Sequence, residues 1–281
     1  MLTRTLWALS VAFAILAASF FAWHLANKRL FSEYVRRVDA GRTYEASARF
    51  DYYIQYVARN IKNPRRDELR PWWVRAYYDF NPLHPGAADV IRWGSDYRGG
   101  CGSHSYVLIA LLKNHGIEAR PLFILDDAGH SIHTVVEAHL GGRWVVGDPS
   151  FGITYRRRDG QLATKEELGA DPALFLAQTR SVPGYNPEYN YDAWTLLNWR
   201  KVPVVLPAIH SVAVRLVGLE RVKEIARPAI WMMPRTFYTT FCAVMAVALG
   251  GTAVMVARRR GRGNRRAASD PASRAALIAR F

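Results

Sequence analysis

The stretch Tyr97-Arg98-Gly99-Gly100-Cys101-Gly102-Ser103-His104-Ser105-Tyr106-Val107-Leu108 places one thiol between glycines, directly before an apolar run. That run, Ser105 to Asn114, predicts a buried helix, which ends at His115-Gly116 because glycine readily adopts left-handed backbone angles. The start of such a helix presents free backbone N–H groups and a positive dipole end to the sulfur, and both favour the thiolate. The flanking glycines predict a sharp backbone turn and open space beside Cys101.

Apolar runs after Gly116 predict β-strands, and the run over Thr134–Leu140 alternates. Strands are expected over Ala119–Leu125, Thr134–Leu140, Arg143–Val146 and Ile153–Arg158. The Gly141-Gly142 pair predicts a tight hairpin between the second and third of these strands. Thr164 followed by Glu167 predicts the capped start of a short helix. A helix followed by hairpin-paired strands is typical of an α+β arrangement.

Two residues near the hairpin complete a candidate site with Cys101. His133 lies at the start of one hairpin strand and Asp148 just past the end of its partner, so the register brings imidazole and carboxylate side by side. An imidazole can hold a thiolate as an ion pair and later protonate a leaving group, and a carboxylate can orient the imidazole. Simpler alternatives stay open: a buried structural cysteine and an ordinary Asp148-Pro149 turn.

Four other histidines compete with His133 for the role of the base, namely His104, His115, His130 and His139. The sequence places no carboxylate beside any of these four by the same register argument. His133 is therefore the favoured base.

The chain from about Tyr97 to Phe151 resembles the bacterial forms of the transglutaminase-like superfamily. The matching pieces are Gly100-Cys101-Gly102, Leu111 to Arg120, His133 to Glu137, and Gly142 to Pro149. The resemblance implies a papain-like core, with the cysteine-bearing helix packed on an antiparallel sheet. It also implies Cys101 as nucleophile, His133 as base and Asp148 as orienter. Val135 departs from the family, where the residue two after the histidine is often aromatic, and this affects the expected substrate groove.

A site of this kind attacks an amide or ester carbonyl and forms a thioester, which then reacts with water or with an amine. The sequence leaves hydrolysis and transfer both open, and we expect no cofactor and no metal. The oxyanion needs a donor besides the Cys101 backbone N–H. Candidates for this donor are the upstream aromatic residues Trp72, Trp73, Trp93 and Tyr97, each of which has core packing as its alternative role.

Two apolar segments predict membrane spans near the ends of the chain. Leu6 to Ala26 is long enough to cross a hydrocarbon core of about 30 Å. A cleaved signal peptide is the alternative, but Trp23-His24 and the basic residues that follow fit a cleavage site poorly, so we expect an uncleaved anchor. Thr239 to Ala257 carries no charge and predicts a second span.

The charges beside the spans predict the orientation of the chain. The arginine block from Arg258 to Arg266 favours a cytoplasmic C-terminus, and Lys28 and Arg29 argue mildly the other way. Two spans put both termini on one side, so we expect an inner-membrane or plasma-membrane protein with a periplasmic middle region. The expected organisation is an N-terminal anchor (1–30), a transglutaminase-like domain (31–200), an amphipathic juxtamembrane segment (201–235), a second span (236–257) and a basic cytoplasmic tail (258–281).

Two further segments have helical periodicity. Thr43 is the expected cap of a helix with apolar positions from Ala46 to Ile61, ended by Asn63-Pro64. Residues 208–225 predict one amphipathic helix, which either packs on the domain or lies on the bilayer.

The formal net charge of +15 suggests an anionic partner. Part of it comes from the arginine block beside the second span, and no nucleic-acid recognition module appears, so we expect anionic lipid or an acidic polymer and no nucleic acid. The second cysteine, Cys242, lies in the second apolar segment, so a disulfide with Cys101 is not expected.

These features predict a membrane-anchored thiol enzyme that acts on amide bonds of protein, peptide or cell-envelope substrates. The alternative is a non-catalytic scaffold or accessory protein in an envelope polymer or secretion assembly. Such a protein would bind its partner through a basic face and the tyrosine-rich segment Tyr185–Tyr191.

Overall fold

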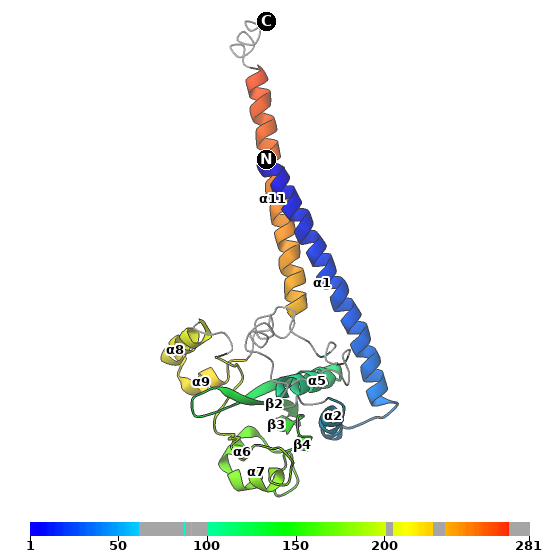
Figure 1. Ribbon diagram of the computed structural model, residues 1–281, viewed down its shortest axis with the longest axis vertical. Coiled ribbons are helices and arrows are strands. Elements are labelled where there is room, and N and C mark those ends of the chain that lie inside the picture. Colours follow the sequence, from blue (N-terminus) through cyan, green and yellow to red (C-terminus); the bar gives the residue numbers. More distant parts are fainter. Residues whose placement is uncertain (62–86, 88–90, 92–99, 201–204, 227–233, 270–281) are drawn as a thin grey trace. The chain divides into compact units, whose positions relative to one another are not determined.

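The structure is a computed structural model of the 281-residue chain and describes residues 1–61, 87, 91, 100–200, 205–226 and 234–269 (Figure 1). Contacts divide the chain into two compact units. One contains residues 1–26 and 233–281, and the other contains residues 27–232.

The larger unit is an α+β domain built on an antiparallel sheet, as predicted (Figure 1). Its strand order is β4-β3-β2-β1-β5. The strands are β1 (Ala119–Leu125), β2 (Ser131–Leu140), β3 (Arg143–Asp148), β4 (Ile153–Thr154) and β5 (Trp194–Thr195). Gly141 and Gly142 both have positive φ angles, of 56° and 79°, and form the predicted tight turn between β2 and β3.

Three strand predictions need correction. β2 begins at Ser131 rather than Thr134 because β1 continues to pair with it, for example through Ile124 and His133. β3 ends at Asp148 rather than Val146 because Asp148 pairs with Ile153 of β4. The strand expected over 153–158 has only two residues, after which Arg156 forms an isolated bridge with Leu162.

Helix α5 (Cys101–Asn114) packs against one face of the sheet and begins at the cysteine, not at Ser105. Its N-cap Gly100 has φ −70° and ψ −173°, which any residue adopts, so the predicted glycine-dependent sharp turn is absent at this position. The end of the helix is as predicted, with Gly116 at φ 72°.

Helix α2 (Ala46–Asn60) packs with α5 and the sheet to form one of two apolar cores. Its cap is Glu45, whose side chain makes no capping hydrogen bond, so the predicted Thr43 cap is wrong: the first helical bond runs from Arg49 N–H to Glu45 O. The Asn63-Pro64 stop lies outside the described residues. Buried side chains from α2, α5 and β2 form this core, including Phe50, Tyr53, Ile54, Val57, Leu108, Leu111, Leu112, Val136 and Ala138.

The opposite face of the sheet contributes to a second core with α6 (Lys165–Ala170) and α7 (Pro172–Thr179) (Figure 1). Thr164 and Glu167 form the predicted capping box at the start of α6. Buried members of this core include Leu122, Ile124, Val135, Val146, Tyr155, Leu168, Phe175, Tyr191 and Leu196. The sheet therefore lies between two apolar layers.

The segment predicted as one helix over 208–225 forms two. α8 spans Val205–Val217 and α9 spans Leu219–Lys223, and Gly218 between them has φ 84°. A residue with this backbone angle cannot continue a right-handed helix, so the prediction of a single helix is wrong.

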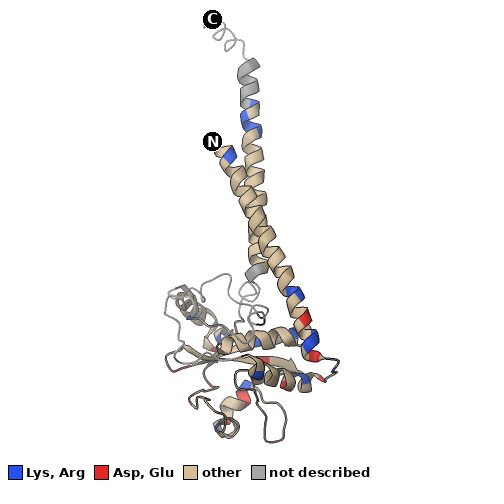
Figure 2. Ribbon diagram, turned by 45° about the vertical axis from the view of Figure 1, so that its right-hand side comes forward, with Lys and Arg blue, Asp and Glu red and all other residues tan. Residues whose placement is uncertain are grey.

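The smaller unit pairs the beginning of α1 (Leu2–Asp39) with α11 (Pro234–Ser269). Both are long and apolar enough to cross a membrane, over Leu2–Asp39 and Thr236–Arg262. The Ser10 hydroxyl donates to the Ala246 carbonyl at 2.7 Å, and Phe13 meets Phe241 edge to face. In Figure 2 the ribbon of α11 is blue, the colour of Lys and Arg, beyond a long stretch without charged residues.

Candidate active site

Cys101 is the first residue of α5, and its thiol is half-buried. The Ser105 hydroxyl, one turn later, donates to the backbone carbonyl of Thr134 in β2 at 3.1 Å. This bond ties the N-terminal turns of α5 to the part of β2 that carries His133. The thiol interacts with both His133 and Thr134.

His133 and Asp148 form a buried hydrogen-bonded pair. His133 Nε2 lies 2.7 Å from Asp148 Oδ2, and both side chains are almost completely buried. Val136 pairs with Gly147, so Asp148 lies across from Val135 and reaches diagonally to His133. The second carboxylate oxygen, Oδ1, accepts the Ser150 backbone N–H at 2.9 Å, which fixes the orientation of the carboxylate.

The two partners of His133 shift its protonation equilibrium. Burial lowers the pKa of His133, but the charge of Asp148 and its hydrogen bond, aided by Cys101, raise that pKa to about 10. Burial likewise raises the pKa of Cys101, but its hydrogen bond to His133 and the charge on that imidazole bring this pKa below its ordinary value. Because Asp148 occupies Nε2, the Nδ1 side of the ring remains for the thiol. The arrangement favours a thiolate paired with an imidazolium.

Aromatic rings surround the imidazole. Tyr189 stacks on His133 with ring centroids 4.4 Å apart, and Phe151 lies at 5.8 Å. Tyr185 packs on Phe151 at 4.7 Å and shares a 2.7 Å hydroxyl contact with Tyr155 in the second core. The segment Tyr185–Tyr191 therefore packs inward over the site and the second core. Because this segment is irregular, no sequence periodicity predicts its packing.

The rival histidines have other partners. The ring nitrogens of His104 lie 3.2 Å from Gly100 O and 2.9 Å from Ile61 O, and burial lowers the pKa of His104. His115 lies 2.9 Å from the Asp39 carboxylate and His130 lies 3.4 Å from that of Asp126, and the strand register predicts neither contact. His139 contacts Trp144 near the far end of β2.

The surroundings of the Cys101 sulfur include open space and the N-terminus of helix α5. Among the described residues, a Cβ built on Gly100 or Gly102 meets no atom within 4 Å, in agreement with the predicted open space. The N-terminal position of Cys101 in α5 leaves its backbone N–H without an intrahelical acceptor. The predicted second oxyanion donors, Trp72, Trp73, Trp93 and Tyr97, all lie outside the described residues.

Residues 33–149 match the family model of the transglutaminase-like superfamily. The match begins upstream of the stretch from Tyr97 to Phe151 and includes α2. A crystal structure of a proposed cysteine protease from Cytophaga hutchinsonii is similar, with 15% sequence identity and a TM-score of 0.33. The similarity covers 47% of this chain and only 40% of that protein. No curated protein matches the chain.

Proposed function

We propose that this chain is a membrane-anchored thiol enzyme that cleaves or transfers acyl groups through Cys101, His133 and Asp148. The observation that carries the proposal is the continuous contact from the Cys101 thiol through the His133 imidazole to the Asp148 carboxylate. The match of residues 33–149 to the family model of the transglutaminase-like superfamily supports the same chemistry.

The proposed reaction has two halves. The Cys101 thiolate attacks the carbonyl carbon of an amide, and the electron pair of the C=O bond moves to the oxygen. The C–N bond then breaks as the His133 imidazolium gives its proton to the leaving nitrogen, which leaves an acyl thioester on Cys101. In the second half, neutral His133 takes a proton from water or from an amine, which attacks the thioester and restores the thiolate. Asp148 keeps the ring oriented and stabilises its charged form.

The oxyanion formed in each half lies at the N-terminus of α5 in this proposal. The Cys101 backbone N–H supplies one donor, and the positive end of the helix dipole adds favourable electrostatics. The proposal keeps Trp72, Trp73, Trp93 and Tyr97 as candidates for the second donor.

The proposed location is a periplasm-like compartment next to the membrane. The two apolar helices support membrane association, and the arginines at the end of α11 favour a cytoplasmic C-terminus. Substrates in this location are amides of proteins, peptides or the cell envelope.

The decisive experiment measures the alkylation of Cys101 by iodoacetamide in the full chain, from pH 5 to pH 9. A variant with Cys242→Ala leaves Cys101 as its single thiol. We expect rapid alkylation already at neutral pH, and His133→Gln should slow it by at least about tenfold because the paired charge is lost. Acetylation of Cys101 by p-nitrophenyl acetate, followed by mass spectrometry, tests formation of the thioester.

A non-catalytic scaffold predicts the opposite behaviour in the same assay. If Cys101 reacts no faster than an ordinary thiol, or if His133→Gln leaves its rate unchanged, the proposed enzyme is excluded. One observation weighs against the scaffold alternative. The tyrosines of the segment Tyr185–Tyr191, which a scaffold would present to its partner, pack against the second core and His133.

A further inference from the structure

Helix α8 carries an exposed apolar ridge. Ile209, Val212 and Leu216 are 50%, 55% and 77% exposed. Their spacing of three and four residues places them on one face of the helix. Val217 and Leu219, at the junction with α9, are also exposed.

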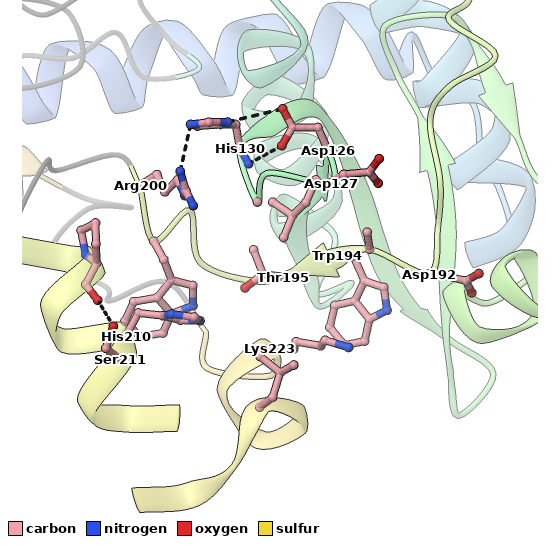
Figure 3. A pocket seen from close by; sticks show the side chains of 16 residues that line it. Asp126, Asp127, His130, Asp192, Trp194, Thr195, Arg200, His210, Ser211 and Lys223 are labelled. Carbon is pink, nitrogen blue, oxygen red and sulfur yellow. Dashed lines mark hydrogen bonds and ion pairs between the residues drawn. The ribbon is translucent and has the colours of Figure 1, made fainter. Parts of the chain in front are cut away.

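The opposite side of α8 faces the protein, where Leu206 is buried. Pro207, His210 and Ser211 line a pocket of about 820 Å³ beside β5, and Figure 3 shows both polar side chains among its lining. The His210 ring contacts the Trp199 indole, with centroids 5.1 Å apart. Ala213 and Val214 are half-buried on this inward side, so α8 is apolar on both sides and leaves one apolar side exposed. A helix on a water-exposed surface normally has a polar outer side.

We propose that the α8 ridge, formed by Ile209, Val212 and Leu216, lies in the interfacial layer of a lipid bilayer. The inference rests on the proposed membrane anchoring but not on the catalytic chemistry. Transfer of aliphatic side chains from water into the acyl-chain boundary of a bilayer is favourable, so a stripe of them in the plane of the membrane stabilises membrane contact.

The path of the chain favours lipid over other occupants. α9 ends at Lys223, and the helix able to span a membrane begins at Thr236. The chain between them reaches at most about 45 Å when fully extended. A segment tethered this closely to a membrane-spanning helix meets the bilayer at a high local concentration.

The charges near the ridge also suit a membrane surface. Arg215 of α8 and Arg221 of α9 are both exposed. Long basic side chains beside an apolar stripe can extend to anionic headgroups while the stripe contacts acyl chains.

Site-directed fluorescence in the full chain tests this contact. The background carries Cys101→Ser and Cys242→Ala, and single cysteines are introduced by Val212→Cys or Leu216→Cys and labelled with bimane. The matched control is Ser211→Cys, on the pocket side of the same helix. Each protein is reconstituted in vesicles of phosphatidylcholine and phosphatidylglycerol, with and without acyl-chain-brominated lipid, and titrated with aqueous iodide.

We expect brominated lipid to reduce the fluorescence at positions 212 and 216 at least twofold, while iodide quenches position 211 more strongly than either. Quenching of positions 212 and 216 by iodide as strong as at 211 overturns the inference. Protection of both positions from iodide and from brominated lipid also overturns it, because a protein surface then covers the ridge.

A fourth label separates this inference from the proposed anchoring. Val247 is an exposed residue of α11, and Val247→Cys should be quenched by brominated lipid if that helix spans the bilayer. Loss of quenching at 247 as well removes the anchoring and the inference together. Loss at 212 and 216 alone overturns only the interfacial contact of α8.

Discussion

The imidazole of His133 and the phenol ring of Tyr189 stack face to face, with centroids 4.4 Å apart and planes 2° from parallel. Asp148 holds the same imidazole at its edge, through Nε2. The ring is thus fixed in two directions by residues from different parts of the fold. A positively charged imidazole over an electron-rich ring is also electrostatically favourable.

Replacement of Tyr189 tests whether this stack supports the ion pair. A ring-cation contact is worth about 0.5–2 kcal/mol, so we expect Tyr189→Leu to slow alkylation of Cys101 at pH 6 by roughly 2- to 20-fold. Tyr189→Phe keeps the ring and should stay within about twofold of the wild type. Burial, together with the charges of Cys101 and Asp148, raises the pKa of Tyr189 to about 12, so the phenol stays neutral throughout the assay.

Equal rates for the Leu and Phe variants would assign Tyr189 a packing role only. Thermal stability of both variants, measured in the same detergent, shows whether a loss of rate comes from unfolding instead.

The Cys101–His133 ion pair predicts a flat pH dependence of stability. Between the ordinary pKa values of 6.5 and 9.0, the unfolded chain holds one proton, on Cys101, and a native thiolate–imidazolium pair also holds one, on His133. Unfolding therefore takes up no net proton at these two groups, and their contribution to the free energy of unfolding does not change across this window.

Cys101→Ala should make the number of bound protons differ between the native and unfolded states. His133 then contributes alone, and Asp148 still raises its pKa, so its stabilisation is complete below pH 6.5 and declines as the pH rises toward its native pKa. We expect the free energy of unfolding of the variant to fall relative to wild type by up to about 1.4 kcal/mol per pH unit. Denaturant unfolding at pH 6.5, 7.5 and 8.5 measures this slope. Cys242→Ala is the control, and an unchanged slope in Cys101→Ala would mean that native His133 is neutral.

The buried carboxylate of Glu137 in β2 forms ion pairs with two cationic side chains. Its carboxylate lies 2.8 Å from Arg120 Nε and 3.1 Å from Lys165 Nζ, and Glu137 and Lys165 are both buried. Glu137→Gln leaves the Lys165 ammonium without this partner in the core, so we expect a loss of about 3–5 kcal/mol in the free energy of unfolding. Glu220→Gln is the control, because Glu220 is 80% exposed in its pair with Lys223 and should change stability by less than about 1 kcal/mol. A Glu137→Gln effect as small as the control's would show that water or another group compensates the cation.

Gly147 of β3 lets α2 approach the sheet closely. A Cβ at this position would overlap Ile54 Cδ1 and lie 2.8 Å from Phe50 Cζ, both on buried residues of α2. We expect Gly147→Ala to lower the free energy of unfolding by about 1–3 kcal/mol. Gly102→Ala should be neutral or stabilising by up to about 1 kcal/mol, because its Cβ meets no described atom within 4 Å and alanine favours the helix. Equal stability of the two variants would contradict the close packing of α2 on β3.

Local sequence patterns were sufficient to predict much of the domain. β1 was predicted at its observed ends because turns flank its apolar residues on both sides. The Gly141-Gly142 turn determined the hairpin register, and that register placed His133 near Asp148. The capping box of α6 was also predictable, since Thr164 and Glu167 satisfy each other's backbone groups within one turn.

Other features depend on contacts between segments far apart in the chain. The true ends of β2 and β3 are set by pairing with β1 and β4, which a single strand's periodicity does not reveal. Two rival histidines also lie beside carboxylates that the strand register does not predict. His115 contacts Asp39 of α1, and His130 contacts Asp126 of its own turn.

The sequence by itself determined which residue types stand at the N-terminus of α5 and at the paired ends of β2 and β3, because turn chemistry and side-chain alternation act over a few residues. Only the tertiary structure placed Tyr189 on His133 and left the apolar ridge of α8 exposed. Irregular segments have no period, and the burial of a helix face depends on what the rest of the chain packs against it.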